Sequence, residues 1–223
     1  MDGVLGFQSG VKLCAATRAG GAVESGMAGA LPSSDIILRR MVDAVEEVRR
    51  RMVRACCALE GAGVRYALVG GNAVAAWVAT VDEGAVRNTR DVDLMIRRSD
   101  LSAARAALES TGFRFCQAAG MDMFLDGPDG RARSAVHIVF AGEFVRPGEP
   151  APNPDVLDST DLGAFRVINL EALVRIKLTA YHDKDRTHLR DLIETGLVDR
   201  SWADRLPPVL AQRLAAILDT PGG

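Results

Sequence analysis

Apolar residues recur every three or four positions between residues 35 and 60, and charged residues fill the intervals. The apolar positions are Leu38, Met41, Val45, Val48, Met52, Ala55 and Leu59. In a helix this spacing places the apolar side chains on one face. The pattern predicts a long amphipathic helix that begins at the polar residues 33–35 and ends at the glycines at 61 and 63.

Short apolar runs, separated by glycine and polar residues, follow this helix. Strands are predicted over 64–69, 91–96, 113–116 and 134–140, and helices over 72–79 and 99–110. Ser99 is expected to cap the second of these helices, and residues 118–129 are open to interpretation as a hairpin. This alternation of strands and helices predicts an α+β core.

The last third of the chain is mostly predicted helix. Four prolines between residues 142 and 161 predict an extended linker, and a short edge strand is expected at 165–168. Helices are predicted over 170–181, 185–195 and 207–219. We therefore expect four segments: a loose N-terminal arm rich in Gly, Ala and Ser (1–34), a core that includes the long helix (35–145), a proline-rich linker (146–164) and a helical C-terminal module (165–223).

Composition narrows the class of protein only a little. The 223 residues carry a formal net charge of -2, so no overall basic field draws the chain to nucleic acid or an anionic membrane. The four cysteines lack a CxxC spacing, which is typical of reduced thiols inside cells. Without a membrane-length apolar run or the pattern of a signal peptide, a cytoplasmic location is expected.

Gly70 and Gly71 lie between a predicted strand and a predicted helix. Glycine lets backbone N–H groups approach a ligand closely, and the N-terminus of the following helix favours phosphate. The segment matches neither the Walker loop nor the GxGxxG pattern. By itself a Gly-Gly turn of this kind is more often structural than functional.

Two acids alternate along the strand predicted at 91–96. Residues i and i+2 of a strand point to the same side, so Asp91 and Asp93 project together while Val92 and Leu94 face the interior. Two adjacent carboxylates repel each other unless a cation lies between them, and their oxygens suit Mg²⁺. The alternative is a solvated strand edge that happens to carry two acids.

Together these two elements are more specific than either one alone. A strand, a Gly-Gly turn and a helix, followed about twenty residues later by Arg87-x-Thr89-x-Asp91-x-Asp93, resemble the nucleotidyltransferase superfamily of the polymerase-beta type. More narrowly, the chain is similar over residues 64–192 to the branch that contains AbiEii-like toxins and antibiotic nucleotidyltransferases. The resemblance implies a mixed sheet flanked by helices.

The resemblance also implies the roles of the motif residues. It assigns Gly70, Gly71, Asn72, Thr89 and Arg90 to binding a nucleoside triphosphate such as ATP. It assigns Asp91 and Asp93 to a catalytic metal, Mg²⁺ or Mn²⁺.

The third carboxylate of that family is replaced in this chain. Its expected place, in the strand at 134–140, holds His137. A neutral imidazole can bind a metal or accept a proton, but it lacks the negative charge that brings two Mg²⁺ ions together. Three interpretations stay open: a single metal, His137 as the base, or impaired catalysis. Asp122 and Glu143 are candidate substitutes for the missing acid.

A further charged segment resembles the AbiEii-like pattern of a lysine, a basic-acidic pair and an Asp-Leu pair. Lys177 and Lys184 lie seven positions apart, about two helical turns, so they share a face if the helix is unbroken. A cationic face would neutralise the charge of a triphosphate during phosphoryl transfer, and Asp185 would orient Lys177 or an arginine. The alternative is a charged, solvated helix, as also expected for Arg49, Arg50 and Arg51.

Three functions are consistent with these residues. The first is an enzyme that moves a nucleoside monophosphate to a hydroxyl of a tRNA, a protein or a small molecule. The second, suggested by His137, is a catalytically impaired nucleotide-binding or regulatory protein, for example in a toxin–antitoxin-like system, with a protein partner on the long N-terminal helix. The third is an unrelated α+β binding module with structural acids.

Overall fold

The computed structural model describes residues 31–220, and most of the N-terminal arm predicted at 1–34 lies outside them. The helices are α1 (Ser34–Gly61), α2 (Gly70–Ala79), α3 (Leu101–Ser110), α4 (Leu170–Ala180), α5 (Asp183–Glu194) and α6 (Pro208–Leu218). The strands are β1 (Tyr66–Val69), β2 (Val92–Ile96), β3 (Phe113–Ala118), β4 (Met121–Asp126), β5 (Val136–Phe140), β6 (Ser159–Asp161) and β7 (Arg166–Ile168). Short 3₁₀ turns lie at 83–85, 98–100, 132–134 and 200–205.

The seven strands form one mixed sheet in the order β3-β4-β5-β2-β1-β7-β6. The β2–β5 and β1–β7 pairs are parallel, and the other pairs are antiparallel. The predicted α+β fold, with a mixed sheet flanked by helices, is thereby confirmed. The strand expected at 165–168 exists as β7, but it is not an edge strand, because β6 from the proline-rich segment pairs along its outer side.

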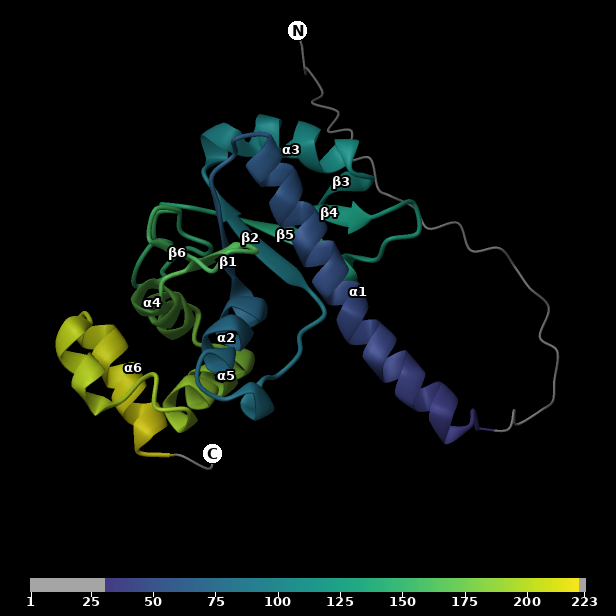
Figure 1. The fold of residues 1–223 in the computed structure, drawn as a ribbon. Coiled ribbons are helices and arrows are strands. Elements are labelled where there is room, and N and C mark those ends of the chain that lie inside the picture. The colour runs from purple at the N-terminus through teal and green to yellow at the C-terminus, as the bar shows by residue number, and fades with distance from the viewer. Residues whose placement is uncertain (1–30, 221–223) are drawn as a thin grey trace, which may run out of the picture.

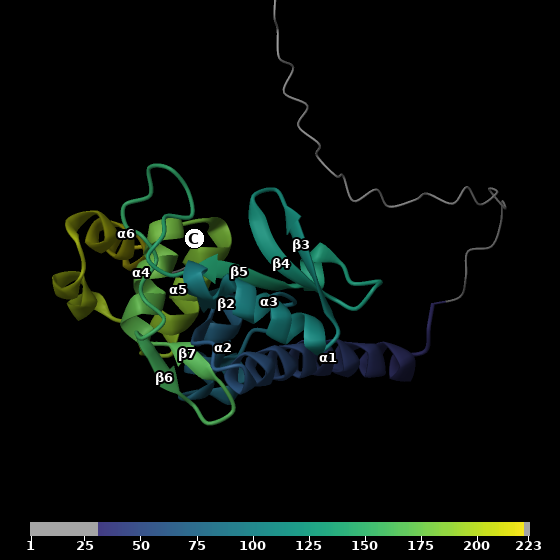
Figure 2. The same ribbon diagram turned by 90° about the horizontal axis from the view of Figure 1, so that it is seen from above.

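The helices pack in two groups (Figure 1). Helix α1 crosses α3 and strands β2 and β5, while α4, α5 and α6 pack against one another and α5 also contacts α2. Figure 2 shows α1 lying along one side of the sheet, with its first turns extending beyond the rest of the fold. No helix among residues 31–220 combines the length and the hydropathy that crossing a membrane requires.

Two local expectations about helix ends were wrong. Ser99 does not cap α3, because the 3₁₀ turn at Arg98–Asp100 precedes the helix and places Asp100 at the N-cap position. The helix predicted at 72–79 begins two residues earlier, at Gly70, so the Gly-Gly pair is the first turn of α2 itself.

The arginine run of α1 is only partly solvated, contrary to the expectation. Arg49 and Arg50 are exposed and pair with Glu46 and Glu47 one turn earlier. Arg51 is only 6% exposed. Its Nε donates to Oδ2 of Asp126 at 3.1 Å, and its Nη1 donates to the carbonyl oxygen of Arg90 at 3.1 Å. Arg51 thus connects α1 to β4 and to the segment just before Asp91.

Replacing Arg51 by Ala should lower the free energy of unfolding by about 1–3 kcal/mol, because Asp126 and the Arg90 carbonyl each lose a charged donor. Arg50→Ala is the matched control, since that side chain is 60% exposed, and it should change stability by no more than about 0.5 kcal/mol. Urea denaturation of both variants measures the difference. Equal losses would contradict a structural role for Arg51.

Candidate functional site

Three strands bring the predicted site residues to one end of the sheet. In the antiparallel β1–β2 pair, Val69 lies opposite Asp93. In the parallel β2–β5 pair, Asp93 lies beside His137. Asp93 is therefore flanked on one side by the end of β1, where the Gly-Gly turn begins, and on the other by His137.

The Gly-Gly turn is fitted closely against the acidic strand. Gly70 has a φ of +69°, and a Cβ atom built there would lie 1.9 Å from Oδ2 of Asp93. A Cβ atom on Gly71 would lie 2.3 Å from Cγ2 of Thr89. A side chain at Gly70 would have to displace the side chain of Asp93, and one at Gly71 the side chain of Thr89. Both glycines are thus explained by close approach, and Gly70 also by its left-handed backbone.

Asn72 and Thr89, predicted to bind nucleotide, use polar atoms to hold the backbone at Asp91. Nδ2 of Asn72 donates to the carbonyl oxygen of Asp91 at 2.7 Å and to Oγ1 of Thr89 at 3.1 Å. The Thr89 hydroxyl donates to the same Asp91 carbonyl at 3.2 Å. These bonds join the first turn of α2 to the residue before β2.

The segment before Asp91 has two further attachments. The backbone carbonyl of Arg90 accepts the hydrogen bond from Arg51. The exposed side chain of Arg90 lines a hollow of about 330 Å³ against α1. Nε of Arg87 donates to Oδ1 of Asp191 on α5 at 2.8 Å. Sequence reasoning missed the Arg87–Asp191 pair, because nothing local links residues so far apart in the chain.

Asp91, Asp93 and His137 form one cluster. A ligand atom of each lies within 4.8 Å of the others, and all three residues are half-buried. Nδ1 of His137 lies 3.4 Å from Oδ1 of Asp93. Nε2 of His137 lies 3.0 Å from the carbonyl oxygen of Ala132. Because a carbonyl only accepts, Nε2 carries a proton and Nδ1 faces the carboxylates.

The acids alter the protonation of His137. The hydrogen bond that His137 donates to Asp93 raises the pKa of His137 above its ordinary value, and the charges of Asp93 and Asp91 act in the same direction against the effect of burial. The two acids therefore favour the protonated form of His137.

A cavity of about 380 Å³ opens beside this cluster. Its wall includes Lys184 and the two acids considered as substitutes for a third carboxylate, Asp122 and Glu143. Glu143 pairs with Arg98 at 2.6 Å, and that bond lowers its pKa. Asp122 is buried and accepts from Gln117 at 2.9 Å. Both acids share the cavity but are held by other partners, away from the cluster.

Lys177 and Lys184 do not share one continuous helix, so the condition for a shared face is not met. Helix α4 ends at Ala180, because Tyr181 takes a left-handed conformation (φ 53°) and α5 starts at Asp183. Lys177 is buried, and its Nζ donates to Oδ1 of Asp185 at 3.0 Å. Lys184 is exposed and borders the cavity. The expected pairing of Lys177 with Asp185 is present.

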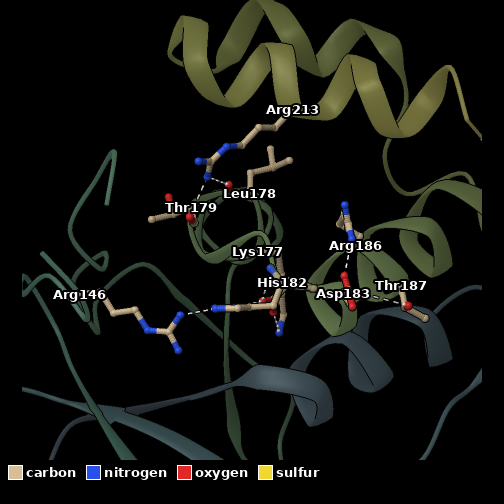
Figure 3. A network of polar contacts seen from close by, with 10 residues as sticks. Arg146, Lys177, Leu178, Thr179, His182, Asp183, Arg186, Thr187 and Arg213 are labelled. Carbon is tan, nitrogen blue, oxygen red and sulfur yellow. Dashed lines mark hydrogen bonds and ion pairs between the residues drawn. The ribbon is translucent and has the colours of Figure 1, made fainter. Parts of the chain in front are cut away.

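The Lys177–Asp185 pair belongs to a network at the α4–α5 junction (Figure 3). Nδ1 of His182 lies 3.0 Å from the other oxygen of Asp185, and Arg146 contacts Nε2 of His182. Burial alone would raise the pKa of Asp185, but Lys177 and His182 outweigh burial and hold it below the ordinary value. The network fixes the start of α5, which carries Lys184.

His188 was not singled out by the sequence. Burial lowers its pKa to about 4, and the nearby Lys177 adds to the effect. Its Nδ1 has no hydrogen-bond partner within residues 31–220. The ring of His188 is thus neutral at pH 7 and adds no charge beside the Lys177–Asp185 pair.

Comparison with known proteins gives similarity only among solved structures. No family model and no curated protein matches the chain. The chain is 15% identical to an antigenic nucleotidyltransferase-like protein from Paracoccidioides brasiliensis, with a TM-score of 0.49 over 79% of this chain and 89% of that one. For the antibiotic-resistance factor ANT(2'')-Ia the identity is 13% and the TM-score is 0.46, over 81% of this chain and 92% of that one. For a putative nucleotidyltransferase from H. pylori the identity is 16% and the TM-score is 0.42, over 80% of this chain and 78% of that one. Similarity at this level carries no inference about activity, which has to come from the chain's own residues.

Gly70→Ala should abolish any rise in melting temperature that added Mn²⁺ causes in the wild type, because the new methyl group occupies the position of the Asp93 carboxylate. Gly63→Ala is a matched control: Gly63 has a φ of +67°, with no atom within 4 Å of the added Cβ. Both variants lose about 1–2 kcal/mol from the left-handed backbone. Differential scanning fluorimetry separates the two effects, and an intact Mn²⁺ response in Gly70→Ala would show that the turn does not position Asp93.

Proposed function

We propose that this chain is a metal-dependent nucleotidyltransferase, which moves a nucleoside monophosphate from a nucleoside triphosphate to an acceptor hydroxyl. The observation that carries the proposal is the Asp91–Asp93–His137 cluster, placed against the Gly70–Gly71 start of α2. Carboxylates alone are common on protein surfaces. Two carboxylates and an oriented imidazole beside a helix N-terminus are a much more restricted arrangement.

The three side chains fit a divalent cation. Asp91 and Asp93 supply oxygen, and His137 supplies Nδ1. The bond from Nε2 to the Ala132 carbonyl is the kind of outer contact that orients metal-binding histidines. Because both ring nitrogens of His137 are then in use, we assign His137 the role of metal ligand rather than general base. We assign a single ion, Mn²⁺ or Mg²⁺, to the site. A bound ion would polarise the phosphoryl oxygens.

The triphosphate would lie at the start of α2. The first N–H groups of a helix lack partners within the helix, and neither Gly70 nor Gly71 has a side chain of its own beside them. We assign Lys184, on the cavity wall, to the phosphate charge. Lys177 and Asp185 are buried against each other, and we assign them to holding α5 in place. We assign Asn72 and Thr89 to holding Asp91 in place.

The acceptor would enter from the other side of the cavity. That side carries the exposed apolar residues Met121, Phe144 and Val145. A cavity of about 380 Å³ is within the range of small-molecule sites, and the chain's net charge of -2 provides no general attraction for RNA. These features favour a small hydroxyl compound over a tRNA end.

A second candidate is a nucleotide-binding or regulatory protein without turnover. It is favoured by His137 standing where a third carboxylate is expected, because the imidazole adds no negative charge with which to recruit a second ion. This candidate predicts the same metal-dependent nucleotide binding, but no transfer.

Nucleoside triphosphate at about 100 times its dissociation constant should stabilise the protein by about 2.7 kcal/mol, and only with Mg²⁺ or Mn²⁺ present. Asp93→Asn should abolish this effect, whereas Asp122→Asn, a cavity acid outside the cluster, should keep it. Thermal unfolding with each of the four nucleotides measures binding, and pyrophosphate release then separates enzyme from sensor. A wild type that no nucleotide stabilises with either metal would overturn both candidates.

His137→Asp should shift the metal preference of nucleotide binding from Mn²⁺ towards Mg²⁺, because an all-oxygen set suits Mg²⁺ better than one with imidazole. His137→Ala should weaken the response to both ions. Titration of each variant with each metal, at fixed nucleotide, gives the ratio of the two apparent affinities. If that ratio is the same in wild type and in His137→Asp, then His137 is not a ligand.

A further inference from the structure

Part of the segment between β5 and β6 forms a closed loop. The backbone N–H of Gly142 donates to the carbonyl oxygen of Asn153 at 3.1 Å, and the N–H of Asn153 donates to the carbonyl oxygen of Glu143 at 2.9 Å. The carboxylate of Glu143 accepts from Arg98 at 2.6 Å. These bonds fix the base of the loop against the body of the protein. We call residues 142–153 the cavity loop.

The first residues of the cavity loop reach the cavity beside the metal cluster. Phe144 and Val145 line this cavity of about 380 Å³, as does Lys184 from α5. The side chain of the next loop residue, Arg146, is exposed and points to His182 (Figure 3). Because His182 lies only two positions before Lys184, this contact holds the guanidinium of Arg146 near the rim of the same cavity.

His182 gives Arg146 a contact without a negative charge. A guanidinium only donates hydrogen bonds, so Nε2 of His182 accepts from Arg146 and carries no proton. Nδ1 of His182 then carries the ring proton and donates it to Oδ2 of Asp185 at 3.0 Å. The contact between Arg146 and His182 is therefore a hydrogen bond to an uncharged ring and not an ion pair.

Two cations at this rim have no acidic partner. Arg98, which lines the cavity, pairs with Glu143, whereas no carboxylate among residues 31–220 forms an ion pair with Arg146 or Lys184. A triphosphate carries more negative charge than one divalent ion neutralises, so its binding calls for further cations. A guanidinium suits this task, because its planar fork can donate two hydrogen bonds to phosphate oxygens.

We propose that Arg146 binds the nucleotide: it leaves His182 when a nucleoside triphosphate binds and, together with Lys184, holds the β- and γ-phosphates at the rim of the cavity. This inference rests on the proposed function, which places the α-phosphate at the ion of the metal cluster. The phosphates that extend from there towards Lys184 are then the outer two. The change requires only a rotation of the exposed Arg146 side chain, a motion that takes nanoseconds or less.

Binding titrations of the full chain with the four nucleoside triphosphates and their monophosphates, each with Mn²⁺, test this role. Arg146→Gln should raise the Kd of the triphosphate about tenfold, because a charged hydrogen bond is lost. It should change the Kd of the monophosphate by less than about twofold. Arg146→Lys, which keeps the charge but not the fork, should give an intermediate Kd for the triphosphate.

Arg186→Gln is the matched control. It removes the same charge from the start of α5, but the Arg186 guanidinium pairs with Asp183 on the other side of His182 from Arg146 (Figure 3). Both Kd values should stay as in the wild type. Melting curves without ligand establish that each variant folds.

His182→Ala separates a binding role of Arg146 from a role in supporting the loop. Without His182, Arg146 can still reach the phosphates, so the ratio of triphosphate to monophosphate affinity should stay as in the wild type. If Arg146 only tied the cavity loop to α5, His182→Ala and Arg146→Gln would lower the triphosphate affinity alike. That outcome would overturn the proposal.

The same titrations distinguish a failure of this inference from a failure of the proposed function. A wild type that binds none of the triphosphates, with Mn²⁺ or with Mg²⁺, would overturn both. A wild type that binds a triphosphate, beside an Arg146→Gln variant that binds it equally well, would overturn only the role of Arg146. Equal losses for monophosphate and triphosphate would also overturn it, because Arg146 would then not act on the outer phosphates.

Discussion

The site depends on the absence of a side chain at Gly70. The end of β1 and the start of α2 can meet the Asp93 carboxylate only because no Cβ atom occupies the space between them. From that approach follow the position of Asp93 opposite Val69, its alignment with His137, and the placement of the α2 N-terminus beside both. A local steric condition thus fixes the relative position of three segments that are far apart in the sequence.

The loop before Asp91 is held from three helices. Asn72 bonds to it from α2, Arg51 from α1 and Asp191 from α5. Each bond uses a backbone carbonyl or a charged pair, so the acids are positioned by contacts that do not consume their own oxygens. The carboxylates of Asp91 and Asp93 therefore remain available to a ligand.

Local pattern predicted most of the elements and the acid pair, because apolar periodicity and the i, i+2 rule depend only on neighbours in sequence. It predicted separate helices at 170–181 and 185–195, but not the left-handed conformation at the end of α4, since tyrosine rarely adopts it. It also missed the burial of Arg51, whose acceptor Asp126 lies 75 positions away, and the interior position of β7, which depends on β6. The adjacency of His137 and Asp93 came from the family resemblance, and only the parallel register gives it a physical basis.

The imidazole in the cluster affects the stability of the folded chain. In a site of three carboxylates, the negative charges repel one another unless a cation is bound. Here His137 lies 3.4 Å from Asp93, and that contact raises the pKa of the imidazole. The contact therefore stabilises the folded chain at pH values below the ordinary pKa of histidine, and its contribution is lost as the pH rises through the raised pKa.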